Sequence, residues 1–145
     1  MRVIIEDIQP GEEEMVILRC TQVDPALLKL INSMKNGAIT LTANQDGKWH
    51  RVLSKDIYYF ESVDHRVFLY TEAECMECRQ KLYELEDLLS IDQFYRISKS
   101  VIVNLQYVKT LAPAFHGRLE ATLTNGEKLI ISRQYVSSLK EILGL

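Results

Sequence analysis

The sequence of 145 residues lacks several features that would point to a particular class of protein. It has only three cysteines, an odd number, and no uncharged apolar run near the ~20 residues of a membrane span. Its beginning, MRVIIEDIQP, carries acidic residues where a signal peptide would have its apolar core. A disulfide framework is therefore not expected, and we predict a cytoplasmic protein.

Motifs for catalysis and for metal binding are also missing. No glycine-rich phosphate loop, G-x-S-x-G or HExxH motif occurs, and the acidic residues of 72–87 fit a solvent-facing surface around a helix start. Cys75 and Cys78 have the spacing of half a zinc site, but no second pair follows, and positions i and i+3 of a strand face opposite sides. We therefore expect no enzyme activity, cofactor, metal or small-molecule substrate.

The chain does contain many short strand-like segments separated by turn signals. Asp46-Gly47, Asp64-His65 and Asn125-Gly126 predict tight hairpin connections. Helices are expected at 26–36, 81–89 and 133–144, and a helix-turn-helix is excluded because no two of them are adjacent. Alternating patterns and short apolar runs predict strands at 38–43, 48–53, 56–63, 66–71, 74–79, 101–105, 107–113, 118–124 and 127–132. The predicted fold class is mainly β, or α+β overall.

The N-terminal third predicts a separate small unit. RVIIE (2–6) and MVILRC (15–20) have the composition of strands, and Asp24 and Pro25 form a typical helix start before the apolar stripe of 26–36. We therefore predict a ββα extension over residues 1–37 and a main domain over 38–145. The apolar strands and the amphipathic helix suggest dimerisation or partner binding.

Charge is unevenly distributed along the chain, whose net charge is −3. Residues 46–93 carry six Lys/Arg and eleven Asp/Glu, whereas residues 94–145 carry seven and three. A basic final third suits a polyanionic partner, because phosphates attract Lys and Arg. A solvated basic face would give the same pattern.

The stretch FYRISKSVIVNL, residues 94–105, places polar side chains directly before a buried strand. Lysine suits phosphate, and serine hydroxyls suit phosphates or base edges. Asn104 interrupts the apolar run, so we expect it to satisfy backbone groups and shape the loop. The polar loop of this stretch consists of Arg96, Ser98, Lys99 and Ser100.

Two further positions carry side chains suited to nucleic acid. His65 lies in the predicted turn beside Arg66; histidine is tolerated in such turns, but an exposed one can also donate to phosphates or bases. Arg133 begins the last helix, where a cation is unfavourable because the helix dipole is positive there. A bound anion or guanine would explain Arg133, and so would a salt bridge to an acidic neighbour.

Four segments, DIYYFESVDHRVFLYT, KLYELEDLL, FYRISKSVIVNLQYV and LTNGEKLIISRQYVSSLKEIL, strongly resemble the LytTR family of DNA-binding output domains. The resemblance covers about residues 38–145 and is most specific at F-x-R-I-x-x-S-x-I-V-N and I-S-R-x-Y. It implies an elongated, mainly β fold whose loops between strands enter successive major grooves. It also implies base and phosphate contacts by His65, Lys99, Ser100 and Arg133.

The polar loop departs from the commoner family pattern, which has His-Arg where this chain has Ser98 and Lys99. Lysine cannot form a bidentate fork, so Lys99 is expected to hold a phosphate. Arg96 matches a position that the family often fills with arginine. The full predicted DNA-binding set is His65, Arg66, Arg96, Ser98, Lys99, Ser100 and Arg133.

The resemblance predicts a transcription regulator without a receiver domain, since residues 1–37 are too short for one. Such a regulator is expected to bind repeated half-sites in double-stranded DNA as a homodimer. Similar small regulators are often paired with a membrane-protein inhibitor. The alternative is a protein-docking module that binds a membrane partner without DNA affinity of its own, which the acidic middle segment favours slightly.

Overall fold

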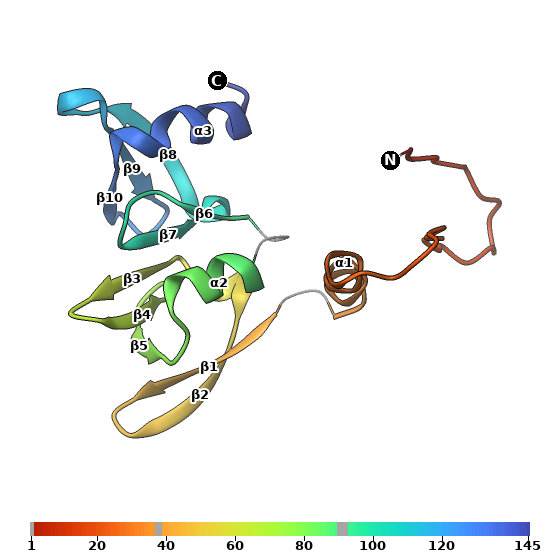
Figure 1. Cartoon of the computed structure of the whole chain (residues 1–145), viewed down its shortest axis with the longest axis horizontal. Helices are drawn as coiled ribbons and strands as arrows, with labels where there is room; N and C mark the ends of the chain where they lie inside the picture. The colour runs from red at the N-terminus through yellow and green to blue at the C-terminus, as the bar shows by residue number, and fades with distance from the viewer. Residues whose placement is uncertain (1, 37–38, 90–92) are drawn as a thin grey trace.

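The computed structural model describes residues 2–36, 39–89 and 93–145. Most of its regular structure lies in two antiparallel sheets (Figure 1). The strands of the larger sheet, in spatial order, are β2 (Lys48–Leu53), β1 (Thr40–Gln45), β5 (Cys75–Cys78), β4 (Arg66–Tyr70), β3 (Tyr59–Val63), β7 (Val101–Asn104) and β6 (Phe94–Arg96). The smaller sheet consists of β10 (Lys128–Ile131), β9 (Leu119–Leu123) and β8 (Val108–Pro113).

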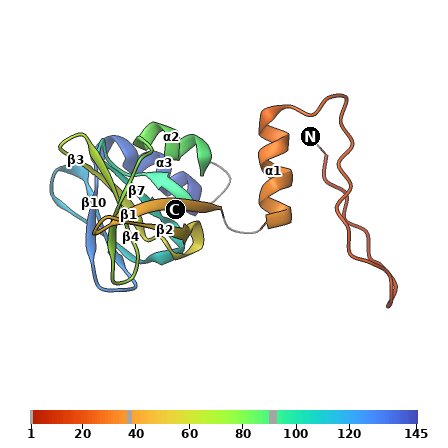
Figure 2. The same cartoon turned by 90° about the horizontal axis from the view of Figure 1, so that it is seen from below.

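The α-helices are α1 (Pro25–Asn36), α2 (Leu82–Leu88) and α3 (Arg133–Leu143), and short 3₁₀ turns are η1 (Ser54–Asp56), η2 (Leu105–Tyr107) and η3 (Phe115–Gly117). Two of the helices, α2 and α3, pack against the sheets, whereas α1 lies apart from them (Figures 1 and 2). Strands separate the three α-helices along the chain, so the described residues contain no helix-turn-helix. The mainly β, α+β prediction is confirmed. None of the described helices is long and apolar enough to cross a membrane.

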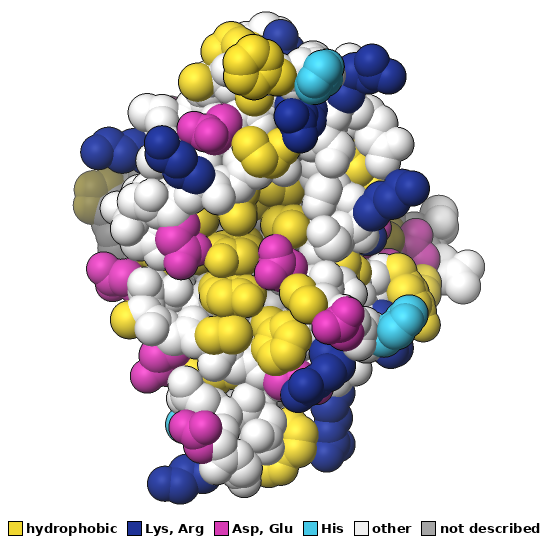
Figure 3. Space-filling model, turned by 90° about the vertical axis from the view of Figure 1, so that its left-hand side faces the viewer, with side chains coloured by type: hydrophobic (Ala, Val, Ile, Leu, Met, Phe, Trp, Pro, Cys, Tyr) yellow, Lys and Arg dark blue, Asp and Glu magenta, His cyan; other side chains and the backbone are white. Residues whose placement is uncertain are grey.

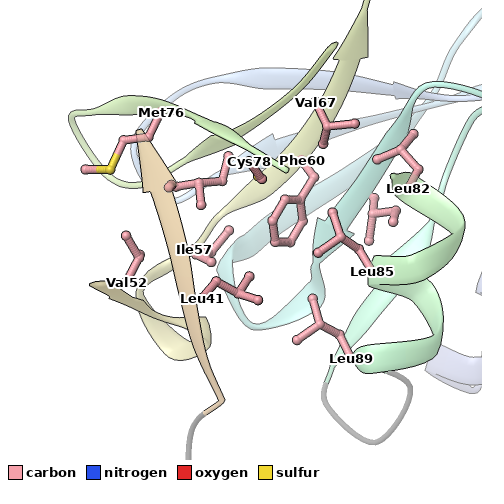
Figure 4. Close-up of a cluster of buried hydrophobic side chains, with 13 residues drawn as sticks. Leu41, Val52, Ile57, Phe60, Val67, Met76, Cys78, Leu82, Leu85 and Leu89 are labelled. Carbon is pink, nitrogen blue, oxygen red and sulfur yellow. The ribbon is translucent and has the colours of Figure 1, made fainter. Parts of the chain in front are cut away.

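The larger sheet is buried on both faces near its β3 and β7 strands. Phe60 and Ile102 face the core under α2, whose Leu85 is fully buried among them (Figure 4). Because successive strand residues point to opposite faces, Tyr59 and Val103 lie in a second core with the smaller sheet and α3. This three-layer packing fixes the ends of β3 and β7, and the loops that continue from them.

Most of the predicted hairpins are present in the fold. Asp46 and Gly47 join β1 to β2 with φ values of 53° and 78°, and Asp64 and His65 join β3 to β4 with 50° and 64°. Two left-handed residues in a row are typical of the type I′ turns that match strand twist. The β9–β10 hairpin is also confirmed, with Gly126 at φ 91°.

The N-terminal prediction is wrong in part. The helix is present as α1, and its Leu27 N–H donates to the Asp24 carboxylate over 2.7 Å as the capping pattern predicts. The strands expected at 2–6 and 15–20 are absent from the described residues, where both segments are extended and exposed (Figures 1 and 2). Strand propensity alone does not hold a two-stranded hairpin in water, because its apolar face needs a further layer. The predicted stop of the helix at Gly37 lies outside the described residues.

Candidate nucleic-acid interface

The β3–β4 hairpin presents His65 at its tip. Val63 pairs with Arg66, so only Asp64 and His65 form the turn, and both are exposed. Histidine and aspartate tolerate positive φ better than branched residues do. The turn therefore holds the His65 imidazole at a fixed point beyond the end of the sheet.

The polar loop between β6 and β7 is anchored on three sides. Buried Ile97 donates to the Val101 carbonyl over 3.0 Å and accepts from the Ser132 N–H over 2.8 Å. The Ser100 carbonyl accepts from the Ser62 N–H over 2.8 Å, which ties the loop to β3. Lys99 lies between these anchors and is exposed, so its ammonium can meet a phosphate.

Arg96 is used inside the protein. Its Nε donates to the Ser98 carbonyl over 2.7 Å, its Nη2 donates to the Lys99 carbonyl, and its Nη1 forms a 2.5 Å ion pair with Glu86 of α2. The side chain is only 24% exposed. These bonds hold the polar loop in place. The DNA contact suggested by the sequence stays a prediction.

Arg66 also has a protein partner. Its guanidinium forms two hydrogen bonds with the Glu77 carboxylate, of 3.0 and 2.5 Å. This pair lowers the pKa of Glu77 and raises the pKa of Arg66, mainly through the hydrogen bonds between them. The charge of Arg66 is thus offset at the surface next to His65.

Arg133 is exposed at the first turn of α3. Ser132 precedes it in an extended conformation but makes no side-chain capping bond. Within the described residues Arg133 forms no salt bridge, so the acidic neighbour considered from the sequence is not found there. Its aliphatic carbons lie against Gly117, where an added Cβ would sit 3.0 Å from Cδ.

Asn104 satisfies backbone groups as predicted, but it lies at the end of β7 away from the polar loop, so the expectation that it shapes that loop is wrong. It is 2% exposed; its Nδ2 donates to the Ile57 carbonyl over 3.0 Å, and its Oδ1 accepts from the Gln106 N–H over 3.0 Å. Both amide groups are therefore satisfied by backbone, which orders the chain between the two sheets.

The hairpin tip, the polar loop and the start of α3 face the same side of the molecule, on the left of Figures 1 and 2. Figure 3 views this side and shows Lys, Arg and His side chains following one another down its right-hand edge, with acidic side chains among them. The structure thus brings the three elements that carry the exposed His65, Lys99 and Arg133 to one side of the molecule. Spaced cations on one face suit a long polyanion better than a compact ligand.

The sequence reasoning missed the turn between β8 and β9 beside Arg133. Phe115 is 83% exposed there, His116 has φ 62°, and the Arg118 Nε donates to the Phe115 carbonyl over 3.0 Å. The only signal was Gly117 between two cationic residue types in AFHGR, which is too short a pattern to predict a site. The fold places this turn against α3.

The two cysteines of the CxxC pattern lie in different environments. Cys75 is exposed and Cys78 is buried on β5, as the strand period predicts. Burial raises the pKa of the Cys78 thiol to about 12, which keeps it protonated. Among the described residues no group of three His, Cys, Asp or Glu side chains could hold a metal ion.

Residues 47–144 match the model of the LytTr DNA-binding domain family. An uncharacterized HTH-type transcriptional regulator of Staphylococcus aureus is 27% identical over 135 residues, covering 92% of this chain and 91% of that protein. The sensory transduction protein LytT of Enterococcus faecalis is 30% identical over 94 residues. That match covers 65% of this chain but only 39% of the longer relative.

A solved structure has the same fold. It is the LytTr DNA-binding domain of a putative methyl-accepting/DNA response regulator from Bacillus cereus, with a TM-score of 0.70 and 28% identity. The superposition covers 73% of this chain and 97% of that domain. Nearly the whole of that DNA-binding domain therefore has the same fold as the matching part of this chain.

Proposed function

The chain belongs to the LytTR family of DNA-binding domains, and from this premise we propose how it binds DNA and regulates transcription. It is a DNA-binding regulator that reads the duplex with the β3–β4 turn, the polar loop between β6 and β7, and the first turn of α3. His65 and Arg133 contact bases, and Lys99 and Ser100 contact the phosphate backbone. One observation carries this assignment: His65, Lys99 and Arg133 are exposed, and the elements that carry them lie on one side of the molecule (Figure 1).

The roles follow from what each side chain offers. Arg133 has a free guanidinium fork, which matches the O6 and N7 acceptors of guanine in the major groove. Lys99 provides a point charge without directional preference, which suits a phosphate. The Ser98 hydroxyl oxygen accepts a hydrogen bond from the Ser100 N–H over 3.2 Å inside the polar loop, so we assign Ser98 with Arg96 to shaping the loop.

The proposal includes the assembly and its surroundings. We propose a cytoplasmic homodimer on repeated half-sites, with the exposed residues 2–24 available for self-association or for a membrane-protein inhibitor. The protein-docking module without DNA affinity has no support among the relatives, whose described functions are regulatory and DNA-binding.

Fluorescence anisotropy with the purified protein tests the proposal. The duplex comes from the region upstream of its own gene, a scrambled duplex serves as reference, and salt is varied. Arg133→Ala should weaken specific binding by about 1–3 kcal/mol and relax the base preference. Lys99→Ala should weaken both duplexes alike and reduce the salt slope by about one unit.

Lys140→Ala provides a matched control, since it removes an exposed cation from the far end of α3. Unchanged specificity in Arg133→Ala would contradict the base-reading assignment. Absence of binding to any duplex at low salt would contradict DNA binding itself and favour the docking module.

A further inference from the structure

Beyond the β3–β4 hairpin that carries His65, the larger sheet extends by three more strands, β5, β1 and β2. Val67 pairs with Cys78, so Arg79 follows β5 beside the start of β4. Farther along, β1 runs antiparallel to β5, and Asn44 pairs with Glu77 of β5 on one side and with Trp49 of β2 on the other. Trp49 therefore lies across β1 from Glu77, whereas the β1–β2 turn lies at the opposite end of the sheet from His65.

An open pocket of about 420 Å³ lies on this extension, next to His65. We call it the flank pocket. The cationic and aromatic side chains that line it are Trp49, His65, Arg66, Arg79 and Lys81. The pocket adjoins the reading hairpin but contains groups that the proposed function does not use.

Two cations of the flank pocket are available to a ligand. The Arg79 side chain is exposed, and its guanidinium carbon lies 4.4 Å from the centroid of the Trp49 ring, a cation–π contact. Within the described residues neither Arg79 nor Lys81 forms a salt bridge. Arg66 contributes little net charge, because Glu77 pairs with it at 2.5 Å.

The flank pocket shares His65 and Arg66 with the β3–β4 hairpin, and Arg79 follows β5, the strand next to β4, one strand spacing of about 5 Å away. An anion held by Arg79 and Lys81 therefore lies next to the hairpin that is proposed to enter the groove. We propose that the flank pocket binds the phosphate backbone of the DNA just outside the groove that His65 enters. This inference rests on the proposed function, and it assigns Arg79 and Lys81 as additional phosphate contacts.

Single substitutions in the full-length protein test the flank pocket. Arg79→Gln and Lys81→Gln should each reduce the slope of log Kobs against log salt by about one unit, and leave the preference over a scrambled duplex unchanged. Hydroxyl-radical protection should be lost at the backbone positions that flank the His65 contact. Lys140→Gln, with the same change of charge on α3, should leave both the slope and the footprint as they are.

Trp49 gives a second measurement that needs no substitution. It is the single tryptophan of the chain and is 51% exposed, so its fluorescence reports on the flank pocket alone. Adding the specific duplex should reduce the quenching of Trp49 fluorescence by acrylamide. The reduction should be complete at the duplex concentration that saturates the anisotropy change.

The outcomes separate this inference from the proposed function. Wild-type slopes in Arg79→Gln and Lys81→Gln, or unchanged quenching of Trp49 in a saturated complex, would overturn the flank pocket alone. A wild-type protein that binds no duplex would overturn both.

Discussion

Gly117 shows how one residue can position a side chain that we propose contacts DNA. Its φ is +73°, and an added Cβ would sit 3.0 Å from Cδ and 3.2 Å from Cγ of Arg133. These are carbons in the middle of the Arg133 side chain, so relieving the contact displaces the guanidinium as well. The missing side chain at position 117 therefore sets the direction in which Arg133 leaves α3.

Gly117→Ala should reduce base discrimination at the Arg133 contact by about fivefold or more, because the guanidinium is displaced from its bidentate geometry. Gly126→Ala is a matched control: Gly126 has φ +91°, but nothing lies within 4 Å of its added Cβ. Both variants should lose about 1–2 kcal/mol of stability from the left-handed backbone. Specificity is measured by anisotropy on duplexes changed at single base pairs. An equal loss of discrimination in both variants would assign the effect to the strained turn instead.

The residue types in the sequence predicted which side chains of the candidate site are exposed, but not which cations form ion pairs within the protein. The exposure of His65, Lys99 and Arg133 agrees with the pattern in the sequence. The partners of Arg66 and Arg96 could not be predicted, because Glu77 and Glu86 approach them only through strand pairing and helix packing. Sequence spacing does not reveal which cations are already neutralised.

The polar loop is the element whose order depends most on a single side chain. Arg96 joins β6, the two loop carbonyls of Ser98 and Lys99, and Glu86 of α2. Without it, these carbonyls would need other donors and the loop would have more conformations. Ordering a flexible loop when DNA binds costs conformational entropy. The native loop is already ordered in the free protein, so its binding does not include this cost.

Arg96→Gln should lower DNA affinity about tenfold and the free energy of unfolding by about 1–2 kcal/mol, because charge-assisted hydrogen bonds are removed. The salt slope should stay at its wild-type value, since a positioning residue neutralises no phosphate. Glu86→Gln removes the ion pair but keeps both hydrogen bonds to the loop carbonyls, so its losses of DNA affinity and of unfolding free energy should be smaller. A slope reduced by one unit in Arg96→Gln would show instead that Arg96 contacts phosphate.

Elements with strong turn signals were predicted better than those that depend on distant partners. The β1–β2 and β3–β4 hairpins follow from Asp-Gly and Asp-His turns, which are local. β6 was missed, because its three residues exist as a strand only through pairing with β7. The strands expected at 2–6 and 15–20 failed for the complementary reason: they have the composition of strands but no neighbour within the described chain.

At the scale of the molecule, the N-terminal segment exposes many large apolar side chains. Ile5 is 88% exposed and Ile17 69% exposed, and further exposed apolar side chains lie beside both. An ion pair of 3.2 Å between Lys29 and Asp87 joins α1 to α2. Residues 2–23 lie beyond α1, away from the two sheets (Figures 1 and 2). The N-terminal segments of two chains can bury these apolar side chains against each other, which a symmetric dimer would allow.

The double variant Ile5→Lys/Ile17→Lys should therefore be monomeric in light scattering at concentrations where the wild type is dimeric. Its affinity for a single half-site should be unchanged, because His65, Lys99 and Arg133 lie in the main domain. Its affinity for a duplex with two half-sites should fall at least tenfold, since linked binding of two modules raises affinity through effective concentration. Leu145→Lys, which charges an apolar residue that is 76% exposed at the other end of the chain, is the control. If the double variant remains dimeric, the main domain contains the dimer contact; if the wild type is monomeric, residues 2–24 are left for a different partner.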